Sequence, residues 1–195
     1  MIAGGRVLVA STDDHTVRAL NATDGQPLWT FTTGARVDTP PTVYRGLALL
    51  GSADGWVTCV RAADGTLVWR RRAAPDDSLI VSHGQLESPW PVHGSVLVTN
   101  RVAYVTAGRS SFLDGGILVY ALDARTGKVL HHHHLEGPWP NIRQDVGEPY
   151  AMEGALADLI VGDGQDLYMR RIKFDAQLNR LPTKQESPLG ELDMG

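Results

Sequence analysis

Residues 17–29 read VRALNATDGQPLW, and the same pattern returns 40 residues later, at residues 57–69, as VTCVRAADGTLVW. A third copy at residues 119–131 reads VYALDARTGKVLH. Each copy alternates apolar and polar residues on both sides of an Asp-Gly or Thr-Gly pair, which is the pattern of a half-buried β-hairpin closed by a glycine turn. Each copy therefore predicts two antiparallel strands.

Further β-like runs precede these hairpins. They lie at residues 6–10, 41–44, 47–51, 95–99 and 102–106. Four short strands in roughly 40 residues are typical of one blade of a β-propeller. We therefore predict an all-β fold, a β-propeller of four-stranded antiparallel blades with about four blades present. The first blade lacks its first strand in this pattern, so we expect an incomplete, open propeller.

The predicted propeller domain covers residues 1–175. Its blades are expected at about residues 1–34, 37–73, 90–135 and 155–175. The chain then turns polar and carries two further prolines, so residues 176–195 are predicted to form a loosely ordered tail. Two long connections, residues 74–90 and 135–154, are rich in Pro, Gly and polar residues. Such loops on a rigid scaffold are the usual place for binding residues.

The composition argues against several classes of protein. The net charge of the 195 residues is −4, which argues against a nucleic acid partner because such domains usually carry a basic face. No apolar run approaches the roughly 20 residues that a membrane span needs, and the first residues do not read as a signal peptide. Cys59 is the only cysteine, which excludes an internal disulfide and a thiolate zinc cage.

The sequence ALDARTGKVL at residues 121–130, with its looser copies that end in Trp29 and Trp69, resembles the tryptophan-docking repeat of PQQ-like (pyrroloquinoline quinone) β-propellers. This family includes quinoprotein alcohol dehydrogenases and the scaffold lipoprotein of outer-membrane β-barrel assembly. The resemblance covers residues 5–135 well and residues 155–175 weakly. It implies an extracytoplasmic, periplasmic location.

Two connecting segments, residues 109–116 and 152–156, look like those of large bacterial PQQ-like repeat proteins of undefined activity. Members of the family generally close with more blades than the four predicted here. The resemblance therefore implies a fragment, or a half propeller that pairs with a second copy. The expected partners are the rest of the propeller or a second copy of the chain, together with other proteins.

The repeat assigns structural roles to its glycines and tryptophans. The turn glycines, which permit a positive φ, are Gly25, Gly65 and Gly127. Trp29 and Trp69 each follow a turn glycine by four residues, and we expect these large flat side chains to lie against the neighbouring blade. The third copy carries His131 at this position, so one docking contact should differ.

Two functions are compatible with the resemblance. The first is a non-catalytic binding or scaffolding portion of a bacterial PQQ-like propeller protein. The alternative is a fragment of a dehydrogenase that depends on PQQ and Ca²⁺, which the resemblance would equip with oxygen ligands for the calcium, an aspartate base, a tryptophan floor and often a vicinal cysteine pair. With Cys59 alone the pair is absent, and no stretch matches the calcium or base positions, so no catalytic residue or metal ligand is assigned. A third function, carbohydrate processing, would need two axial carboxylates at glycosidase separation.

Two polar loops hold the candidate ligand-binding residues. The first contributes Arg109, Ser110, Ser111 and Asp114, which could bind a carboxylate or phosphate. The second contributes Arg143, Asp145 and Glu153. The alternatives are a long hairpin loop held by local side-chain bonds and ordinary loop charges.

A run of four histidines, residues 131–134, ends the third repeat. In a strand alternate residues face opposite ways, so two of these histidines could grip a metal ion. No nearby His or Cys with metal-ligand spacing supplements them. We therefore predict no metal site and interpret the run as the last strand of a blade.

Overall fold

The computed structural model describes residues 1–136, 159–170 and 172–182, and within these ranges the chain forms strands and turns. None of the described segments forms a helix that is long and apolar enough to cross a membrane. The strands make four-stranded antiparallel sheets, four in the described part of the chain, and one two-stranded hairpin. Strands follow one another in chain order across each four-stranded sheet.

The strand bounds repeat along the chain. The first sheet contains β1 (Ile2–Ala3), β2 (Arg6–Ala10), β3 (Thr16–Asn21) and β4 (Pro27–Thr32). The second contains β5 (Thr42–Tyr44), β6 (Leu47–Ser52), β7 (Trp56–Arg61) and β8 (Leu67–Arg72). The small hairpin β9 (Ile80–Ser82) and β10 (Gln85–Glu87) follows. The third sheet contains β11 (Leu97–Thr99), β12 (Val102–Ala107), β13 (Ile117–Asp123) and β14 (Val129–Leu135). The fourth contains β15 (Val161–Gly162), β16 (Leu167–Met169), β17 (Ile172–Phe174) and β18 (Arg180–Leu181).

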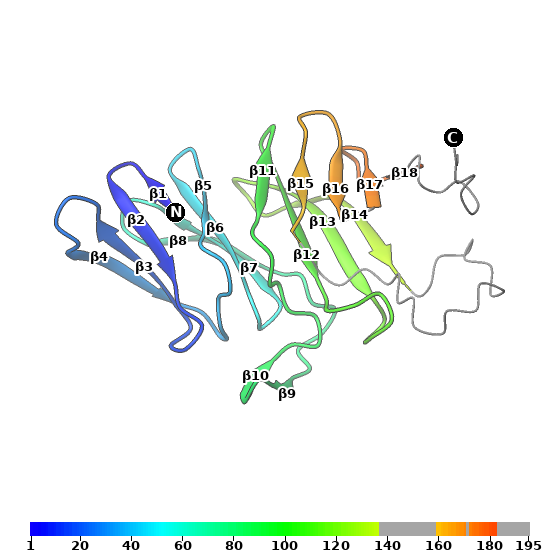
Figure 1. Cartoon of the computed structure of the whole chain (residues 1–195), viewed down its shortest axis with the longest axis horizontal. Helices are drawn as coiled ribbons and strands as arrows, with labels where there is room; N and C mark the ends of the chain where they lie inside the picture. Colours follow the sequence, from blue (N-terminus) through cyan, green and yellow to red (C-terminus); the bar gives the residue numbers. More distant parts are fainter. Residues whose placement is uncertain (137–158, 171, 183–195) are drawn as a thin grey trace, which may run out of the picture.

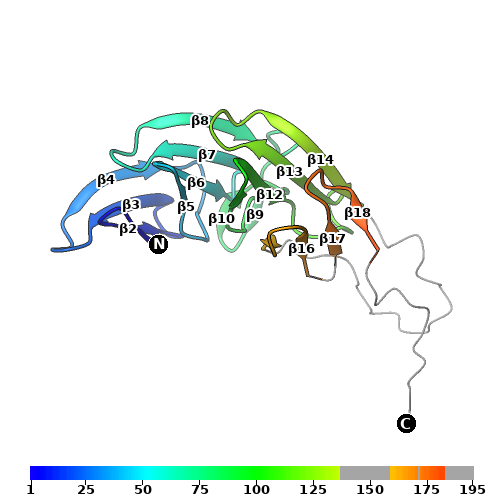
Figure 2. The same ribbon diagram turned by 90° about the horizontal axis from the view of Figure 1, so that it is seen from above.

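Successive sheets stand side by side as propeller blades (Figure 1). Seen from above they fan out in an open arc, with β4, β8 and β14 along the convex side (Figure 2). The core lies between the sheets: Leu49 and Val57 of the second sheet pack in one buried cluster with Val105 and Leu122 of the third. The predicted all-β, open propeller of four-stranded antiparallel blades is confirmed.

Two details differ from the expectation. The first sheet does have a first strand, β1, which the sequence analysis missed because two residues are too few to show alternation; Gly4 and Gly5, at φ 55° and 73°, turn it into β2. The fourth sheet ends at Leu181, beyond residue 175, where the tail was expected to begin. Leu178 holds this last turn in place because its side chain is buried in the core.

Trp29 of β4 fastens the first sheet to the second, and we call this contact the first junction. Its indole Nε1 donates a hydrogen bond to the carbonyl oxygen of Ala62 over 3.2 Å. The ring covers the turn glycine Gly65, where an added Cβ would stand 2.8 Å from a ring carbon. A side chain at that position would have to displace the tryptophan, so glycine is required both for its φ of 73° and for the close approach.

The second junction repeats the first between the second and third sheets. Trp69 of β8 donates to the carbonyl oxygen of Ala124 over 3.2 Å, and an added Cβ at Gly127 would stand 2.6 Å from its ring. A register shift, the mark of a β-bulge, sits next to each docking position. It lies between Ala19 and Leu20, between Cys59 and Val60, and between Ala121 and Leu122. The three copies of the repeat therefore share the same strand irregularity as well as the same sequence pattern.

The third junction, between the third and fourth sheets, uses different residues. His131 of β14 stands where the first two junctions have tryptophan. The phenol of Tyr104 on β12 donates to the carbonyl oxygen of Ala176 over 3.0 Å, and so supplies a hydrogen bond to the alanine of the turn. In this turn Leu178 adopts the positive φ, 65°, and its side chain is 1% exposed.

Candidate functional site

Two kinds of loop lie at the same end of the blades. One kind connects the second strand of a sheet to the third, and the other connects the last strand of one sheet to the first strand of the next. They share one end because the strands are antiparallel and follow chain order. We call this the loop end. It comprises residues 11–15, 33–41, 53–55, 73–96 and 108–116. Backbone hydrogen bonds tie these loops together, as from Ser88 N to Ala53 O over 2.8 Å and from Gly108 N to Pro91 O over 3.1 Å. The loop end is therefore an ordered surface.

A chain of charged groups, the Arg36 network, links two of these loops, residues 33–41 and 73–96. Arg36 donates from Nε to Asp38 Oδ1 over 2.9 Å and pairs through Nη1 with Glu87 Oε2. Asp38 Oδ2 in turn bonds His93 Nδ1 over 2.5 Å. Glu87 is 1% exposed, and its second carboxylate oxygen has no hydrogen-bond partner among the described residues. Removing one partner of such a buried pair would leave the other charge without a counter-charge, and would lower the free energy of unfolding by about 3–5 kcal/mol.

The electrostatics of this network favour the charged form of Asp38. Burial by itself would raise the pKa of this carboxyl, but the hydrogen bond and charge of His93 and the neighbouring Arg36 outweigh burial, and the pKa lies below its usual value. A lowered carboxyl pKa contributes stability above the unfolded-state value near 3.8, and this contribution is lost as the pH falls through the folded-state value. The network is therefore intact at neutral pH.

Hairpin β9–β10 projects from the loop end (Figure 1). One face of it is tied to the blades: Gln85 bonds the ring of His15 over 3.2 Å and the carbonyl of Thr12 over 3.3 Å, while Glu87 pairs with Arg36. Side chains alternate along a strand, so Leu86 points the other way.

The outward face of the hairpin is apolar. Leu86 lies directly opposite Val81 in the strand register, and these side chains are 59% and 76% exposed. Leu79, just before β9, is exposed as well. We call Leu79, Val81 and Leu86 the hairpin ridge. The hairpin ridge therefore faces the solvent, while the opposite face of the hairpin is anchored to the blades by the buried Arg36–Glu87 ion pair.

In the first predicted ligand-binding loop, residues 109–114, polar side chains bond to other groups of the same loop. Arg109 Nη2 pairs with Asp114 Oδ2 at 2.5 Å, and Ser110 Oγ accepts a hydrogen bond from the backbone of Phe112 over 3.2 Å. Ser110 and Ser111 are buried. Arg109 and Asp114 are thus brought together, as the local-bond alternative expects. The large apolar side chains that the loop exposes are Phe112 and its neighbour Leu113.

The other predicted residues, Arg143, Asp145 and Glu153, lie outside the described residues. The Arg36 network, by contrast, was not predicted. Its only sequence signal was the long polar connection that contains Glu87, since Arg36 and Asp38 lie in a short inter-blade segment that looks like any loop.

The histidine run divides between two faces of β14. His133 packs its ring on Phe174 of the fourth sheet at 5.5 Å, and His134 Nε2 bonds the carbonyl of Gly115. Burial lowers the pKa of His133, and the charges of Arg180, His134 and His132 lower it further. Across residues 1–136, 159–170 and 172–182, no three His, Cys, Asp or Glu side chains are grouped to hold a metal ion.

The described side chains do not fit a quinone with calcium. The ring of Trp56 is covered by the Arg70 guanidinium, which stands 4.2 Å from the ring centre, and Trp90 packs against the core. Burial raises the pKa of the Cys59 thiol to about 12, so this cysteine is inert. With no cation site among these residues, no chemistry through that cofactor is derived.

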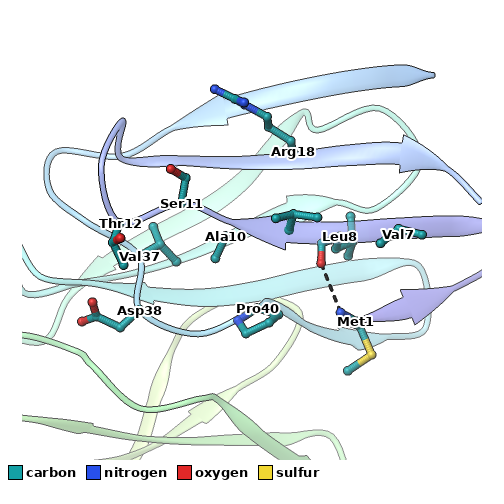
Figure 3. A pocket seen from close by; sticks show the side chains of 11 residues that line it. Met1, Val7, Leu8, Ala10, Ser11, Thr12, Arg18, Val37, Asp38 and Pro40 are labelled. Atoms are coloured by element: carbon teal, nitrogen blue, oxygen red, sulfur yellow. Dashed lines mark hydrogen bonds between the residues drawn. The ribbon is translucent and has the colours of Figure 1, made fainter. Parts of the chain in front are cut away.

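A hollow of about 620 Å³ opens beside the inner edge of the first sheet (Figure 3). Its walls come from β2, from Val37 and Pro40, and from Asp38 of the Arg36 network. The Met1 amino group donates to the carbonyl oxygen of Leu8 over 3.1 Å along one side. The lining is mainly apolar, and Asp38 is already bonded to Arg36 and His93. The hollow therefore has few polar groups left to bind a ligand.

Comparisons with known proteins agree with this architecture. Residues 1–88 match the family model described as outer membrane protein assembly factor BamB. The BamB of Yersinia pestis is 25% identical over 162 residues, which cover 78% of this chain and 37% of that protein. The chain thus spans little more than a third of that relative.

Solved structures show the same fold. BamB from Moraxella catarrhalis superposes with a TM-score of 0.59 at 16% identity, over 93% of this chain and 49% of that one. The quinohemoprotein alcohol dehydrogenase ADHIIG from Pseudomonas putida HK5 superposes with a TM-score of 0.55 at 20% identity, over 69% of this chain and 20% of that one. Fold and repeat together define a β-propeller repeat protein. More particularly, its repeats are similar to those of PQQ-like propellers, the resemblance that the sequence indicated.

Proposed function

We propose that this chain is a non-catalytic binding or scaffolding portion of a bacterial PQQ-like propeller protein, and that its loop end binds a protein partner. The observation that carries the proposal is the hairpin ridge. Val81 and Leu86 form an exposed apolar pair, while the opposite face of the same hairpin is fastened by a buried ion pair to Arg36. Exposed apolar side chains on a rigid projection are a typical protein-binding feature.

The surroundings of the ridge suit a protein interface. Asp76 and Asp77 precede it and His83 lies at its tip, so apolar contacts are rimmed by polar groups, as in protein–protein interfaces. The loop end also exposes Phe112 and Leu113, and large apolar side chains of this kind often anchor partners. A preorganised hairpin binds at a lower entropic cost than a flexible loop.

The relatives support the same class of function. The Yersinia pestis relative is named an outer membrane protein assembly factor. We propose the same class of role for this chain, together with an extracytoplasmic location. Release of the chain with periplasmic markers on osmotic shock is the expected result, and retention with cytoplasmic markers would contradict the location.

Site-specific photo-crosslinking tests the partner proposal. A crosslinking amino acid replaces Val81 in cells of a bacterium that encodes the protein, and the matched control replaces Leu67, an exposed apolar residue of β8. We expect one discrete protein adduct from position 81, several-fold stronger than from position 67, and lost on Leu86→Asp. Equal adducts at both positions, or an adduct that survives Leu86→Asp, would rule out the hairpin ridge as the binding surface.

A further inference from the structure

Two hairpin turns stand side by side at the end of the blades opposite the loop end. One is Arg45-Gly46, between β5 and β6, and the other is Asn100-Arg101, between β11 and β12. The two sheets meet here, since the Thr42 hydroxyl of β5 donates to the carbonyl oxygen of Val96, just before β11, over 2.5 Å. Both turns point away from hairpin β9–β10 (Figure 1). We call residues 45–46 and 100–101 the paired turns.

The backbone of the paired turns is strained at one residue. Four two-residue hairpin turns have both central residues in the described part of the chain, and both φ angles are positive in each, as in a type I′ turn. The second central residue is glycine in three of them, at positions 5, 46 and 84. In the fourth it is Arg101, at φ 68°, a conformation that side chains other than glycine disfavour. Strain of this kind is a reason to look for a function.

The paired turns line a hollow of about 550 Å³. Its lining residues are Tyr44, Arg45, Asn100 and Arg101, and each of these side chains carries a hydrogen-bond donor. The Arg45 guanidinium stands over the Tyr44 ring, 5.4 Å from the ring centre. Within residues 1–136, 159–170 and 172–182, none of the four side chains forms a hydrogen bond or an ion pair. The hollow is therefore rich in donors that have no acceptor.

The carboxylates of the neighbouring turns are held by their own turns. Asp64 pairs with Arg61 at 2.8 Å. Asp123 accepts hydrogen bonds from the backbone N–H and the hydroxyl of Thr126, both over 2.9 Å. Arg101 acts on Asp123 through its charge and forms no ion pair with it within the described ranges. The described lining of the hollow therefore carries two positive charges and no carboxylate, in a chain whose net charge is −4.

We propose that the hollow at the paired turns binds a phosphate monoester. Two guanidinium groups from different sheets match a dianion, since arginine forms charge-assisted and often bidentate hydrogen bonds with phosphate oxygens. The Tyr44 hydroxyl and the Asn100 amide can donate to the remaining oxygens. The hollow also has room for an organic group, because small-molecule sites usually measure about 300–1,000 Å³. This site is separate from the hairpin ridge and does not rest on the function proposed for the loop end.

Titration of the isotope-labelled 195-residue chain with glycerol 3-phosphate tests the proposal. At constant ionic strength and about pH 7.5 the monoester is mainly a dianion, because its second pKa is near 6. We expect the amide resonances of Arg45 and Arg101 to shift in a saturable way. Acetate, a monoanion, should bind roughly tenfold more weakly or worse. No saturable shift at either arginine, or equal affinity for acetate, would overturn the proposal.

Substitutions in the two turns separate binding from folding. Arg101→Gly removes one guanidinium and relieves the positive φ, so its unfolding temperature should be equal to or above that of the unchanged protein. Arg45→Asn removes the other and leaves Asn-Gly, a favoured type I′ pair. In each variant the affinity should fall by roughly tenfold or more, as expected when a charged hydrogen-bond donor is lost. An unchanged affinity in either variant would overturn the proposal.

The matched control is Arg125→Gln. Arg125 is an exposed arginine in a turn at the same end of the third sheet and does not line the hollow. This variant should bind glycerol 3-phosphate as the unchanged protein does. A loss as large as that in Arg101→Gly would overturn the proposal, because the effect would then be one of overall charge.

A second probe distinguishes the source of the phosphate group. Phosphatidylcholine vesicles with and without phosphatidic acid carry the same monoester on a lipid, and flotation measures the binding of the protein to them. Shifts with glycerol 3-phosphate and no flotation would support a soluble organic phosphate as the ligand. Flotation that needs phosphatidic acid and is lost in Arg45→Asn and Arg101→Gly would support the site with a lipid headgroup as its ligand. Binding to neither probe would overturn the proposal.

Discussion

The second and third junctions solve the same packing problem with different side chains. At the second, one residue, Trp69, covers a turn glycine and donates a hydrogen bond to the turn carbonyl. At the third, the two tasks are divided: Leu178 of the turn fills the core itself, and Tyr104 of an inner strand supplies the hydrogen bond. The comparison shows that the repeat preserves a filled core and a satisfied carbonyl rather than a particular residue.

The largest effect should come from breaking the second junction at its tryptophan. Trp69→Ala removes the ring over Gly127 and the indole donor to Ala124, and we expect a loss of about 3–5 kcal/mol in the free energy of unfolding. Denaturant unfolding measures it. Trp56→Ala is the matched control, because that ring is stacked under Arg70 and should cost much less. Equal losses for the two variants would show that docking is not what stabilises the junction.

Changing the glycine partner should have a smaller effect. Gly127→Ala introduces a Cβ that collides with Trp69 and also strains a positive φ, so we expect a loss of about 2–4 kcal/mol. Gly84→Ala, in the hairpin β9–β10, strains a similar φ of 74° but meets no neighbour within 4 Å, and should cost only about 1 kcal/mol. Thermal unfolding of both proteins gives the difference, and a difference near zero would remove the collision from the explanation.

The third junction can be weakened at a single atom. Tyr104→Phe deletes the phenol that donates to the carbonyl of Ala176 and leaves the ring in the core, so we expect a loss of about 1–2 kcal/mol. Tyr44→Phe is the matched control. It removes the phenol oxygen from a ring that stacks with Arg45, and it should change the free energy of unfolding by less than about 0.5 kcal/mol. If the two substitutions are equivalent in denaturant unfolding, the Tyr104 phenol does not replace the indole.

The smallest effect should be a pH dependence confined to the third junction. His133 packs on Phe174, and its lowered pKa means that the unfolded chain binds the proton more readily than the folded one. Its contribution is therefore present above about pH 6.5 and is lost as the pH falls through the folded-state value. The protection of the β17 amides, taken as their exchange relative to the intrinsic rate at each pH, should fall between pH 7 and pH 5, while the protection of the β7 amides should not.

The control for this measurement is His133→Phe, which keeps an aromatic contact and removes the titration. With it the pH dependence of the protection in β17 should disappear. A dependence that persists would assign the effect to a group other than His133.

Much of the fold could be predicted because it depends on sequence patterns of short range. Alternation, the turn glycines and the 40-residue offset each depend on residues close in the chain. The blades, and the packing of Trp29 and Trp69 against the neighbouring blade, could therefore be predicted from the spacing. Tyr104 could not be singled out in this way. It stands in β12 where β2 and β6 have leucine, and in a strand pattern it looks like one more core residue.

The loop end marks the limit of sequence reasoning most clearly. Arg36 and Glu87 are 51 residues apart, and no periodicity connects them. Arg109 and Asp114, which were predicted as candidate ligand-binding residues, form an ion pair with each other. Side chains in loops find partners through the packing of distant segments, and that packing depends on how the blades are placed.

By itself, the sequence determined that this protein repeats a four-stranded blade and which glycines and tryptophans hold neighbouring blades, because strand alternation and turn conformation are local properties of the chain. Only the tertiary structure decided which charges meet at the loop end and which apolar side chains stay on the surface of the hairpin. These depend on long-range contacts, whose energy is set by burial and desolvation once the sheets stand side by side.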